Sequence, residues 1–117
     1  MKKILVVDDE ENIRLLYQEE LSDDGYEVEV ARDGEEALAK FEEFRPDLIT
    51  LDLKMPGMDG IEVLHRIREK DRSVPIILLT AYSEFRQDLS TWASNAYIVK
   101  SSDTSELKEK IRELLGE

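Results

Sequence analysis

Apolar residues gather in five short runs that are separated by longer segments of mixed polarity. Four of these runs are almost entirely apolar, as expected for β-strands that are covered on both faces of a sheet. The second run instead alternates valine with glutamate, which is typical of a strand at the edge of a sheet. The sequence therefore predicts five strands, over residues 4–7, 28–31, 47–51, 75–80 and 96–99.

The segments that follow these runs carry apolar residues three or four positions apart, which is the spacing of one face of an α-helix. We expect helices around residues 13–21, 37–44, 61–67, 85–92 and 107–115. Three of them are preceded by an acid that has a glutamate three positions later, a signature of helix N-termini. The capping acids would be Asp33, Asp59 and Asp103.

Strands and helices alternate along all 117 residues, with no repeat, linker or low-complexity tract. Alternating β and α units form a parallel sheet, and right-handed crossovers place helices on both of its faces. We therefore expect an α/β fold, a (βα)5 doubly wound five-stranded parallel sheet, with residues 1–117 as a single domain. The last helix would end at Gly116, which leaves no residues for an output domain.

The composition narrows the classes of partner. The formal net charge is −12 and there is no cysteine, so we expect neither a disulfide nor a cysteine-ligated metal. The negative charge argues against direct nucleic-acid binding, which needs a basic face, and against an anionic membrane surface. The N-terminal apolar run is too short for a signal peptide, and no run approaches the length of a membrane span. We therefore expect a cytoplasmic protein.

Polar functional groups stand at the ends of four predicted strands. Asp8 and Asp9 follow the first strand, Asp52 follows the third, Thr80 ends the fourth and Lys100 follows the fifth. In a doubly wound sheet, ligands bind beyond the carboxyl ends of the strands. We therefore expect these side chains to meet in one pocket.

Several of these residues also have an ordinary structural interpretation. Asp8 with Glu11 fits the acid-x-x-Glu pattern and could cap the first helix. Thr80 could be an ordinary strand or cap residue, and Lys100 a solvated lysine. Asp52 differs, because the Leu-Lys-Met-Pro-Gly segment that follows it contains a proline and a glycine and cannot begin a helix.

Three carboxylates in one pocket need a cation. Two carboxylates about 5 Å apart repel by roughly 3 kcal/mol at an effective dielectric constant of about 20. Lys100 offsets part of this repulsion, and a hard divalent cation offsets more. An all-oxygen cluster suits magnesium, and a carboxylate beside Mg²⁺ and an ammonium group is arranged to attack phosphorus.

The motifs VVDDE, LDLKMPGMDG and LLTA, and the lysine that follows AYIV, resemble the receiver domains of two-component response regulators. The resemblance covers essentially the whole chain and is closest to single-domain receivers of the chemotaxis and sporulation-relay type. It implies a flavodoxin-like strand order 2-1-3-4-5. It also implies that the protein acts in phosphorelay signal transduction.

The resemblance assigns a role to each residue of the pocket. Asp52 would accept the phosphoryl group, and Lys100 would contact that group. Thr80 would move to bind it, and Tyr97 would be the aromatic switch residue, although Tyr97 could equally serve ordinary packing. The Mg²⁺ ligands would be Asp8, Asp9, Asp52 and the backbone carbonyl of Lys54.

The resemblance also implies partners. The donor would be a phosphohistidine on a sensor histidine kinase or a histidine phosphotransfer protein. Phosphorylation would alter a surface made of the fourth helix, fifth strand and fifth helix, which would bind a downstream protein target. The protein would then be no conventional enzyme, although it would assist its own phosphorylation and dephosphorylation.

Two other functions share part of this pattern. One is a receiver-like binding module that works without phosphorylation. The other is a magnesium-dependent phosphohydrolase of the haloacid dehalogenase type, which also forms an aspartyl phosphate. That class carries a second acid two positions after its nucleophile, where this chain has Lys54.

Three features depart from the receiver pattern. Ser101 stands where the family usually has a proline, which could loosen the loop that directs Lys100. The segment from Thr80 to Lys100 is slightly shorter than usual, so the fourth helix or its turn would be altered. Lys54 places a cation two residues after the acceptor, where its side chain could influence hydrolysis of the acyl phosphate or supply local charge.

Overall fold

A five-stranded parallel sheet forms the centre of the computed structural model, which describes residues 1–80, 95–100 and 103–117. The strand order is β2-β1-β3-β4-β5, as the resemblance implied. The alternating strand β2 lies at an edge of the sheet, which confirms that prediction. The strands are β1 (Lys3–Val7), β2 (Glu27–Ala31), β3 (Leu48–Asp52), β4 (Ile76–Thr80) and β5 (Ala96–Val99).

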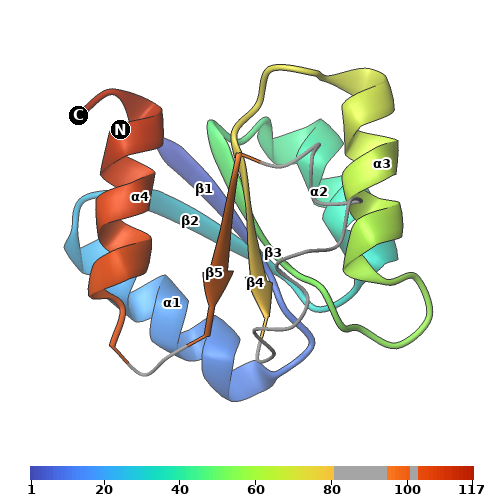
Figure 1. The fold of residues 1–117 in the computed structure, drawn as a ribbon, viewed down its shortest axis with the longest axis horizontal. Coiled ribbons are helices and arrows are strands. Elements are labelled where there is room, and N and C mark those ends of the chain that lie inside the picture. Colours follow the sequence, from blue (N-terminus) through green and yellow to red (C-terminus); the bar gives the residue numbers. More distant parts are fainter. Residues whose placement is uncertain (81–94, 101–102) are drawn as a thin grey trace.

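Four described helices cover the two faces of the sheet, with α1 and α4 on one face and α2 and α3 on the other (Figure 1). They occupy the places that apolar spacing predicted, whereas the helix expected around residues 85–92 lies outside the described residues. The helices are α1 (Glu11–Asp23), α2 (Gly34–Phe44), α3 (Gly60–Lys70) and α4 (Ser105–Leu115).

The core has two halves, one on each face of the sheet. Alternate residues of a strand point to opposite faces, so neighbouring residues such as Leu48 and Ile49 enter different halves. Helices cover both faces, and every residue of β3 and β4 is buried as a result. This explains why the strands appear in the sequence as continuous apolar runs.

Two of the three predicted helix caps are confirmed. Asp33 and Asp59 each accept a hydrogen bond from the amide of the glutamate three residues later, at 2.8 and 2.9 Å. The prediction for Asp103 is wrong. Its carboxylate accepts the amide of Ser105, only two residues later, so it closes a turn before the helix and Thr104 takes the N-cap position.

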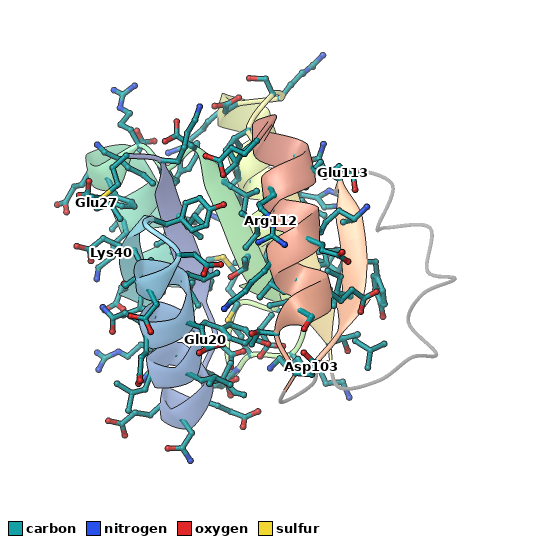
Figure 2. The ribbon with its side chains drawn as sticks, turned by 90° about the vertical axis from the view of Figure 1, so that its left-hand side faces the viewer. Glu20, Glu27, Lys40, Asp103, Arg112 and Glu113 are labelled. Atoms are coloured by element: carbon teal, nitrogen blue, oxygen red, sulfur yellow. The ribbon has the colours of Figure 1, made fainter. Side chains whose placement is uncertain are left out.

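Polar contacts join α1 and α4, which lie side by side on their face of the sheet (Figure 2). Thr104 Oγ1 donates to Glu20 Oε1 at 2.9 Å, and Lys108 Nζ lies 3.2 Å from the same oxygen. The hydrogen bond from Thr104 and the contacts with Lys108 lower the pKa of Glu20. These contacts hold the start of α4 against α1.

Across the described ranges, no helix is long and apolar enough to cross a membrane.

Candidate functional site

The carboxyl edge of the sheet holds a buried cluster of two acids and one lysine. Lys100 Nζ lies 2.7 Å from Asp8 Oδ2 and 3.2 Å from Asp52 Oδ1. Strands β1 and β3 are neighbours, so Asp8 and Asp52 leave the sheet side by side, and Lys100 reaches them from the end of β5. The structure thus brings together three residues that the sequence placed at separate strand ends.

Asp8 makes hydrogen bonds through both its backbone and its side chain. Its backbone amide donates to the carbonyl of Ala31 at 3.0 Å, which extends the pairing of β1 with β2 beyond the last strand residue. Its Oδ1 accepts the amide of Glu10 at 2.9 Å. Glu10 is the N-cap of α1 and makes no side-chain capping bond. Asp8 therefore closes the turn before α1. It does not cap the helix, although its spacing to Glu11 had predicted a cap.

The loop after β3 folds back over Asp52. The amide of Lys54 donates to Asp52 Oδ1 at 3.3 Å, and the amide of Gly60 donates to the carbonyl of Leu53 at 3.0 Å. A Cβ atom at Gly60 would lie only 2.2 Å from the backbone oxygen of Asp52. Only glycine lets α3 begin this close to the strand end, and this close approach keeps the loop against Asp52.

Burial and charge set the ionisation of the pocket. Burial, together with the nearby Asp8 carboxylate, raises the pKa of Asp52 to about 7, although Lys100 acts in the opposite direction. Burial alone would lower the pKa of Lys100, but its contacts with Asp8 and Asp52 outweigh burial and raise it. The lysine is therefore charged at neutral pH, and it stabilises two acids that would otherwise be costly to bury.

A candidate cation site lies at the exposed side of the pocket. Carboxylate oxygens of Asp8, Asp9 and Glu10 all lie within 4.8 Å of one another. Oxygen donors with this much negative charge fit a hard divalent cation such as Mg²⁺. Asp52 is not one of these three residues, but it lies next to them. A side-chain hydrogen bond with Asp9 contributes to the rise in the pKa of Asp52. The residues present therefore fit the metal that the sequence predicted.

The other predicted residues take three different positions around the pocket. Thr80 is buried at the end of β4, and its carbonyl accepts the amide of Lys100 at 2.6 Å. Tyr97 is half-buried on β5 and packs against the half of the core under α2 and α3. Lys54 is exposed. Ser101 and most of the shortened segment before β5 lie outside the described residues, so their predicted effects stay predictions.

Sequence reasoning missed three residues of this region. Glu10 joins the acidic group, and Arg14 donates from Nη1 to the carbonyl of Asp8 at 2.7 Å. Tyr17 is buried nearby, where burial raises its pKa and the charge of Lys100 partly offsets that effect. The helical spacing after Asp8 was the available signal, since one face of the first two turns of α1 lies beside the strand end that the helix follows.

Comparison with known proteins places this geometry in a family. The family model for the response regulator receiver domain matches residues 4–112. Sporulation initiation phosphotransferase F of Bacillus subtilis is 37% identical over 116 residues, which are 97% of this chain and 94% of the relative. The chain spans about half the length of several other curated relatives that it matches, which are transcriptional regulators.

Two solved structures are also similar. Response regulator TrrA of Thermotoga maritima in complex with Mg²⁺-BeF is 56% identical, with a TM-score of 0.94 over 97% of this chain and 99% of that chain. A chain from the structure of histidine kinase ThkA in complex with TrrA is also 56% identical, with a TM-score of 0.92 over 98% of this chain and 99% of that chain. The protein belongs to the response regulator receiver domain family, a family of phospho-acceptor signalling modules rather than conventional enzymes.

Proposed function

We propose that residues 1–117 form a single receiver domain that accepts a phosphoryl group on Asp52. The donor would be a phosphohistidine on a sensor histidine kinase or a histidine phosphotransfer protein. The observation that carries this proposal is the buried contact of one ammonium group with two carboxylates, since Lys100 lies 2.7 Å from Asp8 and 3.2 Å from Asp52. The similarity to TrrA, which was crystallised in complex with a histidine kinase, supports the class of partner.

Asp52 acts as the nucleophile. An oxygen of its carboxylate forms a bond to phosphorus while the bond from phosphorus to the donor imidazole nitrogen breaks, and the imidazole leaves with the electron pair. Phosphoryl transfer needs chiefly positioning and charge stabilisation. The amide of Lys54 and the ammonium of Lys100 hold Asp52 Oδ1 in place. In the product, Lys100 stabilises the negative oxygens of the transferred group.

Asp8, Asp9, Asp52 and the backbone carbonyl of Lys54 would hold Mg²⁺. When bound, the metal supplies positive charge that offsets the acids and the incoming phosphoryl oxygens. The donor chemistry supports this assignment, because the pocket offers oxygen ligands and the acids outnumber the lysine. The complex of TrrA with Mg²⁺-BeF supports it further. Glu10 lies in the same acidic group and would add negative charge at its exposed side.

Thr80 and Tyr97 would transmit the change. Thr80 ends β4, which pairs with β5, and its carbonyl accepts the amide of Lys100. A movement of the Thr80 hydroxyl toward the phosphoryl group would therefore act on β5. Tyr97 lies on β5, three residues before Lys100, and is half-buried, so it can change its exposure. The altered surface, which includes β5 and α4, would bind a downstream protein target.

The pocket would also assist its own phosphorylation and dephosphorylation without turning over a separate substrate. A phosphohydrolase of the haloacid dehalogenase type would need an acid where the exposed Lys54 stands. Turnover of small phosphate esters tests that alternative, and we expect none. A binding module that works without phosphorylation would bind its partner equally well before and after treatment with a phosphodonor.

Intact-mass measurement after incubation with acetyl phosphate tests the proposal. We expect a gain of one phosphoryl group that requires Mg²⁺ and is absent in Asp52→Ala. A folded wild-type protein that binds Mg²⁺ but gains no phosphoryl group would contradict it and favour the phosphorylation-independent module. Phosphorylation of Asp52→Ala to the same extent as wild type would show that the acceptor is another residue.

A further inference from the structure

Arg14 makes a short contact with the backbone of the acidic pocket. Its Nη1 donates to the carbonyl oxygen of Asp8 at 2.7 Å, across six residues of sequence. The side chain is half-buried, and its own amide donates to the carbonyl of Glu10 at 3.1 Å as part of the first turn of α1. A hydrogen bond from a charged guanidinium is stronger than one between neutral groups. Arg14 therefore ties the first helix to the end of β1.

This contact acts on both acids of the Asp8-Asp9 pair. The carbonyl that Arg14 holds belongs to the peptide group that joins the two residues. A peptide group is planar, so fixing its oxygen also fixes the amide nitrogen of Asp9 and the direction in which the chain enters Asp9. Asp8 is held further by Ala31, Glu10 and Lys100. Asp9 is exposed, and α1 restrains it through the peptide group that it shares with Asp8.

We propose that Arg14 is a positioning residue that holds the Asp8-Asp9 peptide group in the orientation required for cation binding. This inference rests on the proposed function, in which Asp8 and Asp9 hold Mg²⁺. Substitution of a residue that orients metal ligands through a second layer of hydrogen bonds typically lowers metal affinity by about 10- to 100-fold. Arg14 occupies such a layer here, although it contacts a backbone oxygen and not a carboxylate.

The sign of one measurement separates positioning from simple charge. The guanidinium is a cation near Asp8, Asp9 and Glu10, so its charge alone opposes the binding of a second cation. Removing only that charge would strengthen Mg²⁺ binding. Removing a positioning contact would weaken it. The two roles of Arg14 thus predict opposite changes in the dissociation constant for Mg²⁺.

Isothermal titration with MgCl₂ on the whole chain, without any phosphodonor, measures this constant. We expect Arg14→Met to raise the Kd for Mg²⁺ by about tenfold, as found for other second-layer residues. Arg14→Lys keeps the charge and one donor, so its Kd should fall between those of wild type and Arg14→Met. The matched control is Arg32→Met, which removes the same charge from a side chain 71% exposed just after β2, and its Kd should equal that of wild type or be slightly lower.

An Arg14→Met protein that binds Mg²⁺ as tightly as wild type or more tightly would overturn the inference. If that variant does not fold, Arg14→Gln replaces it, because glutamine also lacks the charge and has a shorter side chain than arginine, and a Kd equal to or lower than that of wild type would again overturn the inference. Asp9→Asn is titrated in parallel. A wild-type protein that binds no Mg²⁺ would contradict the proposed function itself, whereas weak binding by Asp9→Asn together with normal binding by Arg14→Met would contradict only this inference.

Discussion

Lys100 Nζ lies 3.2 Å from Asp52 Oδ1, and the two side chains are only 11% and 5% exposed. The same ammonium lies 2.7 Å from Asp8, so one cation serves two buried carboxylates. The pocket therefore keeps an excess of negative charge. This excess, together with burial, accounts for the raised pKa of Asp52 and for the fit of the site to a divalent cation.

The first prediction concerns pH. The pKa of Asp52 is about 7 in the folded protein and 3.8 in its ordinary state, so between these values the folded state holds a proton that the unfolded state has lost. The contribution of Asp52 to stability is therefore fully present below pH 4 and is lost as the pH rises to about 7. A shift of this size corresponds to roughly 4 kcal/mol of unfolding free energy.

Urea unfolding of metal-free protein at several pH values from 4 to 8 measures this effect. Asp52→Asn cannot titrate at this position, so we expect its stability relative to wild type to increase over the same interval. Taking the difference between the two proteins removes the contributions of acids that do not interact with Asp52. A constant difference across the interval would show that Asp52 ionises normally in the folded state.

The second prediction concerns Lys100→Ala. Without the ammonium, Asp8 and Asp52 are buried without a cation, and we expect the metal-free protein to lose roughly 3 kcal/mol of unfolding free energy. Mg²⁺ binding should persist, because the acids remain and a competing cation is gone. The surface change should be lost. Titration calorimetry and amide chemical shifts of β5 with and without acetyl phosphate measure these effects, and failure of Lys100→Ala to bind Mg²⁺ would count against the assigned ligand set.

The third prediction concerns Asp9→Asn. Asp9 is exposed, so the substitution should leave the melting temperature of the metal-free protein unchanged or slightly higher. A ligand that binds only the folded state stabilises it by RT ln(1 + [L]/Kd), so at a given concentration tighter binding gives a larger rise in melting temperature. We therefore expect Mg²⁺ to stabilise wild type but to have little effect on Asp9→Asn. Equal stabilisation of both proteins in a thermal scan at several Mg²⁺ concentrations would remove Asp9 from the site.

The fourth prediction compares two glycines. In Gly60→Ala the new Cβ would lie 2.2 Å from the carbonyl oxygen of Asp52, so the helix must move away from the acceptor. We expect a loss of about 3 kcal/mol or more, as for other overpacked sites. Gly25→Ala meets no atom within 4 Å and suffers only from its positive φ of 94°, which costs about 1 kcal/mol. Equal losses in urea unfolding would mean that the loop after β3 adapts freely.

The fold could be predicted because its elements have strong local signals. Strands buried on both faces must be apolar throughout, and helices that cover a sheet on one side must carry an apolar stripe. The predicted site followed from one topological rule, that parallel strands end at the same edge, and this was enough to bring Asp8, Asp52 and Lys100 together.

Some contacts cannot be predicted from the sequence pattern, because they depend on the path of the backbone. The spacing from Asp103 to Glu106 fits a helix cap, but a two-residue turn shifts the helix start by one residue. The contact of Arg14 has no signal in the sequence, because it is made to a backbone carbonyl group. No side-chain pattern reports which backbone oxygen a long side chain will reach, and this requires the position of the helix relative to the strand.

Identification of the modified residue tests the central claim most directly. After treatment with acetyl phosphate and Mg²⁺, sodium borohydride reduces an aspartyl phosphate to homoserine, and peptide mass spectrometry then locates the homoserine. We predict homoserine at position 52 only, with none when Mg²⁺ is withheld. Homoserine at position 8 or 9, or none in protein that has gained a phosphoryl group, would contradict the assignment of Asp52 as the acceptor.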